Sequence, residues 1–141
     1  MITIKITDKE TPQFNAFSDE EWETTDLQYH RRKVDWTKER RFILAYEKKQ
    51  IVGLLELSME AGVMHIIDLI IEHTHQKKGI GTSLMEHAEE MAKQNKIHKI
   101  FLETGGNWTV RAFYEKLGYE KTGDLPKHFA KQDYVEYSKF I

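Results

Sequence analysis

One short stretch has the residue types and spacing of an anion-binding turn: Gln76-Lys77-Lys78-Gly79-Ile80-Gly81-Thr82. Glycine has no Cβ, so Gly79 and Gly81 allow close approach of the backbone to a ligand and torsions that other residues avoid. The stretch follows an apolar segment and opens an amphipathic one, so a helix should begin there. Free N–H groups at the start of a helix, together with the helix dipole, favour a bound phosphate or diphosphate.

Two better-known phosphate motifs fit this stretch poorly. A Walker A loop requires a lysine directly before its Ser or Thr, and Gly81 precedes Thr82 instead. A dinucleotide fingerprint requires a third glycine where Leu84 stands. A tight turn between a strand and a helix, with no ligand, is the ordinary structural alternative.

The elements around the turn follow from hydrophobic periodicity. Residues 64–72 (MHIIDLIIE) are almost continuously apolar, which is typical of a strand covered on both faces. Residues 79–94 carry apolar and charged stripes at helical spacing, and residues 99–103 predict a further strand. Residues 107–117 predict a second helix, stopped by Gly118.

The remaining segments are predicted mainly as strands. Alternation predicts a strand over residues 1–7, and residues 41–46 and 51–59 predict a hairpin. A capping box at Ser18 and Glu21 predicts the start of a helix, with acids at its beginning and bases at its end. Two last strands are expected at residues 119–122 and 133–140. The order of elements predicts an α/β or α+β domain with a mixed sheet.

The composition limits the classes of protein to consider. The 141 residues suit a single domain, 1–141, that buries its own core. A formal net charge of −2 gives no cationic excess for nucleic acid, and the absence of cysteine excludes disulfides and thiolate chemistry. No apolar run reaches the roughly 18 residues that span a bilayer, and the first residues lack the pattern of a signal peptide. We therefore expect a cytoplasmic protein without nucleic-acid or membrane partners.

Two motifs together resemble those of the GNAT superfamily of N-acetyltransferases. Gln76, Gly79 and Gly81 match its Gln/Arg-x-x-Gly-x-Gly/Ala pattern. Residues 107–119 (NWTVRAFYEKLGY) look like its Asn-x-x-Ala-x-x-Phe/Leu-Tyr-x-Lys-x-Gly-Phe segment, departing at Val110 and at the last position. The resemblance covers about residues 64–141. It implies a GNAT-like fold in which helices flank a mixed, mostly antiparallel sheet and a splayed strand pair forms the cleft for coenzyme A.

The resemblance implies acetyl-CoA as co-substrate and assigns residues to it. The pyrophosphate would lie on backbone N–H groups of residues 78–82, and the pantetheine arm would pair with residues 69–71 like an added strand. An N–H group near Leu69 would face the thioester oxygen. Asn107 matches a position that binds the pantetheine arm, although asparagine also suits a helix N-cap. The cofactor-binding residues are expected to be Leu69, Ile70, Ile71, Gln76, Lys77, Lys78, Gly79, Ile80, Gly81, Thr82, Asn107 and Tyr114.

The resemblance also implies a general acid, and the chemistry requires a base. Tyr114 matches the family's usual acid, which protonates the departing thiolate, although its spacing also fits a core aromatic. The base must deprotonate an alkyl ammonium group of pKa about 10.4. Glu103, which ends a strand beside the cleft, is the first choice and His65 the second. By strand period His65 shares a face with Leu69, whereas Asp68 lies on the other face, where a carboxylate within an apolar run needs a partner.

These assignments predict an N-acetyltransferase that moves an acetyl group from acetyl-CoA to a primary amine by direct attack, without an acyl-enzyme. The acceptor would be a small-molecule or peptide amine of open identity. A sensor of the same fold that binds acyl-CoA without turnover is the alternative. No metal is expected, because the His-x-His spacing of His73 and His75 lacks a third ligand. Dimers are common in the family, so a homodimer is also an expectation.

Overall fold

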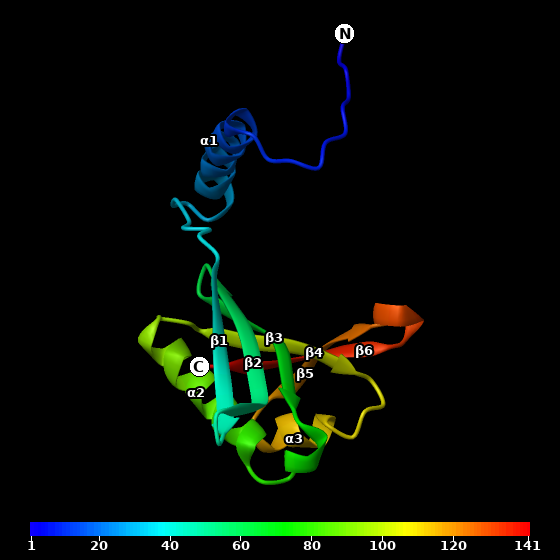
Figure 1. Ribbon diagram of the computed structural model, residues 1–141. Helices are drawn as coiled ribbons and strands as arrows, with labels where there is room; N and C mark the ends of the chain where they lie inside the picture. The colour runs from blue at the N-terminus through cyan, green and yellow to red at the C-terminus, as the bar shows by residue number, and fades with distance from the viewer. The chain divides into compact units, whose positions relative to one another are not determined.

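Six strands form one sheet, in the order β1-β2-β3-β4-β6-β5, in the computed structural model, which describes residues 1–141 (Figure 1). Only β3 and β4 are parallel neighbours, and the other four pairs are antiparallel. The predicted mixed, mostly antiparallel sheet is therefore confirmed. The strands are β1 (Glu39–Glu47), β2 (Gln50–Glu60), β3 (Val63–Ile71), β4 (Lys99–Gly105), β5 (Glu120–Leu125) and β6 (Tyr134–Phe140).

Three α-helices and two short 3-10 turns complete the chain. The α-helices are α1 (Pro12–Tyr29), α2 (Ile80–Gln94) and α3 (Arg111–Lys116), and the 3-10 turns are η1 (His73–His75) and η2 (Phe129–Lys131). The chain divides into two compact units, Met1–Trp36 and Thr37–Ile141, and the whole sheet belongs to the second unit. The expectation of one acetyltransferase domain over residues 1–141 stays a prediction.

Helix α1 begins earlier than the sequence predicted. The Thr11 side-chain oxygen accepts a hydrogen bond from the Phe14 N–H group at 3.1 Å, and Pro12 occupies the first helical position, where its fixed φ fits. The capping box predicted at Ser18 is wrong, because Ser18 lies inside the helix. The first turn consequently holds no acidic residue and the last turn no basic one, so the predicted match of charge to helix dipole is also wrong.

The predicted strand over residues 1–7 does not form. Ile2, Ile4 and Ile6 alternate as a strand would, but their side chains are exposed and no strand pairs with them. An alternating pattern supplies an apolar face, whereas a strand also needs a neighbouring edge for its N–H and C=O groups.

A single hydrophobic core lies between one face of the sheet and the helices α2 and α3 (Figure 1). Leu84, Met85 and Ala88 of α2 are buried against Leu55 and Leu57 of β2, as the amphipathic pattern predicted. From α3, Tyr114 joins the same core. The other sheet face is not covered within the unit Thr37–Ile141, where Phe42 and Ile70 are 61% and 57% exposed.

Two predictions for elements beside the core need correction. The helix predicted over residues 107–117 starts only at Arg111, because residues 107–110 form turns, although Gly118 does end it with a φ of +91°. Strand β3 is covered on one face rather than on both, because Ile67 and Ile70 are exposed. The apolar run in its sequence therefore overstated its burial.

Strands β3 and β4 separate soon after they meet. Their parallel pairing covers only Val63–His65 against residues 99–101, whereas β4 pairs with β6 over its whole length. Beyond His65 and Phe101 no ladder joins the two strands, which is the splayed pair that the fold was expected to contain.

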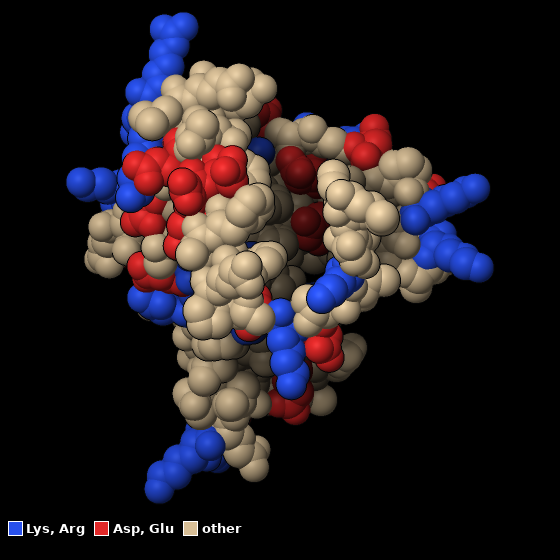
Figure 2. All heavy atoms as spheres, turned by 90° about the horizontal axis from the view of Figure 1, so that it is seen from above, with Lys and Arg blue, Asp and Glu red and all other residues tan.

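None of the helices combines the length and apolar character needed to cross a bilayer. In Figure 2 basic side chains (blue) and acidic side chains (red) both lie at the surface.

Candidate active site

A cleft of about 470 Å³ lies where β3, the start of α2 and α3 meet. Most of the residues predicted to bind the co-substrate line it together: Leu69, Ile70, Ile71, Gln76, Lys77, Gly79, Ile80, Gly81, Thr82 and Tyr114. Strand β3 contributes its free edge, because the ladder to β4 ends at His65. The cleft thus has a strand edge along one side and a helix N-terminus at one end.

Two glycines at the N-terminus of α2 leave its backbone N–H groups accessible. Gly79 has a φ of +82°, in the left-handed region that favours glycine, and no side chain caps the helix. The first intrahelical bond runs from the Ser83 N–H group to the Gly79 carbonyl, so the N–H groups of residues 80–82 remain free. A Cβ on Gly81 would lie 3.3 Å from Cζ of Phe113, so a larger side chain at this position would crowd the ring. These features suit a bound anion such as a diphosphate.

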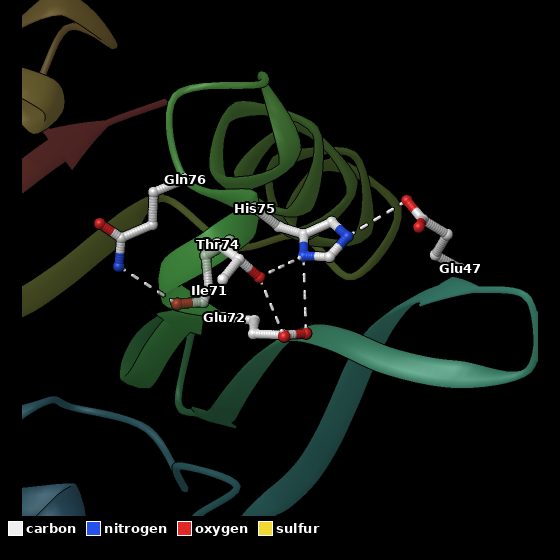
Figure 3. A network of polar contacts seen from close by, with 6 residues as sticks. All are labelled: Glu47, Ile71, Glu72, Thr74, His75 and Gln76. Atoms are coloured by element: carbon white, nitrogen blue, oxygen red, sulfur yellow. Dashed lines mark hydrogen bonds and ion pairs between the residues drawn. The ribbon is translucent and has the colours of Figure 1, made fainter.

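A polar network holds the segment that leads into this helix (Figure 3). His75 Nε2 lies 3.2 Å from Oε2 of Glu47, the last residue of β1 before the β1–β2 turn, and His75 Nδ1 lies 3.1 Å from the Thr74 hydroxyl oxygen. Thr74 donates to Glu72 at 3.0 Å, and the Gln76 amide donates to the Ile71 carbonyl at 3.2 Å. The network ties η1 to the β1–β2 turn and fixes the path of the chain into the cleft.

Tyr114 presents its phenol to the cleft from the core side of the sheet. The residue is 7% exposed, and its ring packs edge-on against Phe113 at 5.1 Å and Tyr119 at 6.2 Å between centroids. Its hydroxyl makes no hydrogen bond within the protein and is not sealed from solvent. Burial raises the pKa of Tyr114 to about 12, so the phenol keeps its proton throughout the neutral range.

Stability is expected to fall in alkali because of two buried phenols. Burial raises the pKa of Tyr114 to about 12, and burial together with the Glu89 carboxylate raises the pKa of Tyr119. Below pH 10 both phenols are protonated in the folded and in the unfolded protein. Above pH 10 the phenols of the unfolded protein lose their protons, whereas those of the folded protein keep them. For Tyr114 this lowers the free energy of unfolding by about 1 kcal/mol by pH 11.

Urea denaturation at pH 8 and pH 11 measures this effect. Tyr114→Phe should reduce the alkaline loss of stability, while Tyr46→Phe, at a tyrosine that is 60% exposed, serves as the matched control. An equal loss in all three proteins would contradict the assignment to Tyr114.

The two candidate bases lie side by side outside the cleft. His65 Nε2 is 3.0 Å from Glu103 Oε2, and the side chains are 29% and 23% exposed. The imidazole stacks on Phe101, with 4.4 Å between ring centroids and 4° between planes. The pair lies at the last rung before β3 and β4 separate.

A β-bulge changes the predicted faces of β3. Leu55, Leu57 and Met59 alternate along β2 and are buried, and their cross-strand partners are Leu69, Ile66 and Met64. Core-facing residues of β3 are therefore spaced by two and then by three, so Ile67 is the extra residue of the bulge.

The bulge overturns two predictions made from strict alternation. The prediction that His65 and Leu69 share a face is wrong, because Leu69 packs on the core and His65 lies on the open face. Asp68 shares the face of His65 rather than opposing it, and it is exposed, so its carboxylate remains solvated and needs no partner.

Two predicted binding residues lie outside the cleft. Lys78 does not line it. Asn107 lines a separate cavity of about 530 Å³ beside Arg111 and the loop between β5 and β6. Asn107 is also not a helix N-cap, because α3 begins four residues later.

Sequence reasoning missed some of the cleft wall. Thr109, Val110 and Phe113 line the cleft from α3 and the turn before it. The helical spacing of Val110 and Phe113 is a signal for an apolar stripe, and such a stripe can form a cleft wall as well as core. His75, noted in the sequence only for its His-x-His spacing, also lines the cleft. No group of three or more His, Cys, Asp or Glu residues is arranged to hold a metal ion.

Comparison with protein families decides the kind of protein that carries this cleft. The model described as "Acetyltransferase (GNAT) family" matches residues 4–119. The chain belongs to this family. GNAT proteins use acetyl-CoA and act on amine acceptors, in agreement with a cleft that joins a strand edge to an anion-binding helix start.

Individual relatives of this GNAT protein match parts of it. The uncharacterized protein YxbD of Bacillus subtilis is 39% identical over 74 residues, which are 52% of this chain and 45% of YxbD. The spermidine N(1)-acetyltransferase of Vibrio cholerae is 29% identical over 116 residues, 73% of this chain and 66% of that enzyme. The match to YdhI of B. subtilis covers 56% of that relative. The chain therefore spans about half the length of the first curated relatives it matches.

Solved structures agree on the GNAT fold. An acetyltransferase from Bacillus cereus superposes with a TM-score of 0.73 at 19% identity, covering 97% of this chain and 98% of that one. A Bacillus anthracis acetyltransferase in complex with acetyl coenzyme A gives a TM-score of 0.65 at 23% identity, covering 72% and 62%. At these identities the likeness concerns the fold.

Proposed function

We propose that the protein is an acetyl-CoA-dependent N-acetyltransferase that transfers the acetyl group directly to a primary amine. The observation that carries the proposal is the single cleft in which the free edge of β3, the uncapped start of α2 and the Tyr114 phenol meet. Membership in the GNAT family supports it.

Different parts of the cleft have different roles. The free N–H groups of residues 80–82 bind the diphosphate of acetyl-CoA, and the backbone of residues 69–71 pairs with its pantetheine arm. The thioester then lies near Leu69, between the two splayed strands, where a backbone N–H group stabilises charge on the carbonyl oxygen. Tyr114 gives its proton to the departing thiolate, and either Glu103 or His65 takes the proton from the amine.

An acetylation assay with a varied library of primary amines tests the proposal. With acetyl-CoA present, at least one amine should cause release of free CoA thiol and gain an acetyl group that mass spectrometry detects. Spermidine belongs in the library, because a relative acts on it. Tight binding of acetyl-CoA without transfer to any amine would instead support an acyl-CoA sensor, and absence of binding would refute both functions.

A further inference from the structure

The His65–Glu103 pair leaves one imidazole nitrogen free. An ionised carboxylate only accepts hydrogen bonds, so the 3.0 Å contact to Glu103 Oε2 requires that His65 Nε2 carries the proton. In the neutral ring Nδ1 then has an exposed lone pair, and no protein group forms a hydrogen bond to it. The carboxylate thereby selects the tautomer in which Nδ1 is the basic atom.

The ring is held firmly in this orientation. Stacking on Phe101 at 4.4 Å fixes the plane of the imidazole, and the bond to Glu103 fixes its rotation within that plane. Both partners come from β4, at and just beyond the last rung that it shares with β3. The side chain of His65 is still 29% exposed, so a ligand can reach it.

The pair and Tyr114 lie on opposite sides of the sheet. Tyr114, on α3, packs in the core between the helices and the sheet, whereas His65 lies on the open face, opposite to Leu69 because of the bulge at Ile67. Beyond His65 the two strands no longer pair, so this part of the sheet has no β3–β4 hydrogen-bond ladder. For His65 to act as the base, the amine must approach between the unpaired ends of β3 and β4 from the open face, while the thiolate leaves toward the phenol.

The charged surroundings of His65 are mixed. On the same sheet face the titratable and charged groups are Arg40 of β1, Glu56 and Glu60 of β2, Asp68 of β3, Lys99 and Glu103 of β4, Tyr134 and Glu136 of β6, and Glu120 of β5. Glu56 is paired with Arg40, and Glu136 lies 3.8 Å from Lys99, so both carboxylates have a cation of their own. Of these groups, only Glu103 forms a hydrogen bond with His65.

We propose that His65 is the catalytic base of the transfer, acting through Nδ1, and that Glu103 is a positioning residue that holds the tautomer and stabilises the imidazolium. This inference rests on the proposed function. As the amine nitrogen forms a bond to the acetyl carbon, the carbon–sulfur bond breaks and its electron pair stays on sulfur. The proton lost by the amine goes to His65 Nδ1, and the sulfur receives a proton from Tyr114.

Three variants separate the two roles: His65→Gln, Glu103→Gln and, as control, Glu136→Gln. Glu136 lies directly across from Glu103 on β6, so the control removes the same charge from the same face without touching His65. The measurement is kcat for one amine that the wild type acetylates, at saturating substrates, from about pH 5.5 to 9. Ionisation of the amine affects all four proteins alike and cancels in the comparison.

We expect His65→Gln to lower kcat by about 100-fold or more. It should also remove the fall of kcat at low pH (the acid limb) that comes from protonation of the base. Glu103→Gln should lower kcat by about 10- to 100-fold but retain the acid limb, because the imidazole is still present and only the carboxylate that orients it is lost. Glu136→Gln should resemble the wild type. Acetyl-CoA affinity, by calorimetry, should change little in any variant.

Two results would overturn the inference while leaving the proposed function standing. If Glu103→Gln removes the limb and His65→Gln retains it, Glu103 is the base. If neither variant alters kcat or the profile, the pair is structural. A wild type that binds acetyl-CoA yet acetylates no amine is a failure of the proposed function itself.

Discussion

Replacing Gly81 with glutamate is expected to abolish the binding of acetyl-CoA. A Cβ at this position lies 3.3 Å from Cζ of Phe113, so the side chain is crowded from the α3 side and extends into the cleft. Its carboxylate then competes with the diphosphate for the free N–H groups of the first turn of α2 and repels it. We expect affinity to fall by more than about 100-fold, or about 3 kcal/mol, in isothermal titration with acetyl-CoA.

The matched control for this variant is His87→Glu. It introduces the same residue into the same helix, at an exposed position beyond the first turn and outside the cleft. Circular dichroism establishes that both variants are folded. A folded Gly81→Glu protein that binds acetyl-CoA within a few-fold of the wild type would show that the cleft is not the binding site.

The second large effect is expected from Tyr114→Phe, which should lower kcat by about 100- to 10,000-fold while leaving acetyl-CoA affinity almost unchanged. Phenylalanine keeps the ring packing against Phe113 and Tyr119, so the cleft keeps its shape. Only the proton donor is lost. Burial raises the pKa of Tyr114 to about 12, so the wild-type phenol is protonated at every pH at which transfer is assayed.

Single-turnover release of CoA thiol, together with calorimetry, separates chemistry from binding for this variant. Tyr119→Phe is the control, because it removes a hydroxyl from the same aromatic cluster, one that donates to Glu89 at 3.1 Å and lies outside the cleft. If the two variants lose the same small factor in rate, Tyr114 is a core aromatic and the acid is another group or water.

Local signals in the sequence were enough to predict helix α2 of the cleft and the turns near it. Helix α2 follows from an amphipathic stripe, and Gly79 marks its start, since a left-handed φ is favourable mainly for glycine. The β1–β2 hairpin and the stop at Gly118 follow from short-range turn chemistry. The two family motifs resemble those of GNAT proteins on sequence alone, and the family match at residues 4–119 agrees.

Signals of the same local kind failed where a partner decided the outcome. Residues 1–7 alternate correctly but form no strand, because no edge pairs with them. The sequence at Ser18 resembles a capping box, yet Thr11 and Pro12 begin the helix seven residues earlier. The helix predicted to start at Asn107 starts only at Arg111, and Asn107 lines a cavity other than the proposed acetyl-CoA cleft.

By itself, then, the sequence determined which segments are apolar on one side, where backbone N–H groups are left free, and which side chains could act as acid or base. Only the tertiary structure decided that His65 and Glu103 are one hydrogen-bonded pair on the open sheet face, opposite Leu69 and Tyr114. The physical reason is the bulge at Ile67. The face that a residue occupies depends on the register with the neighbouring strand, and a single extra residue reverses it for every position that follows.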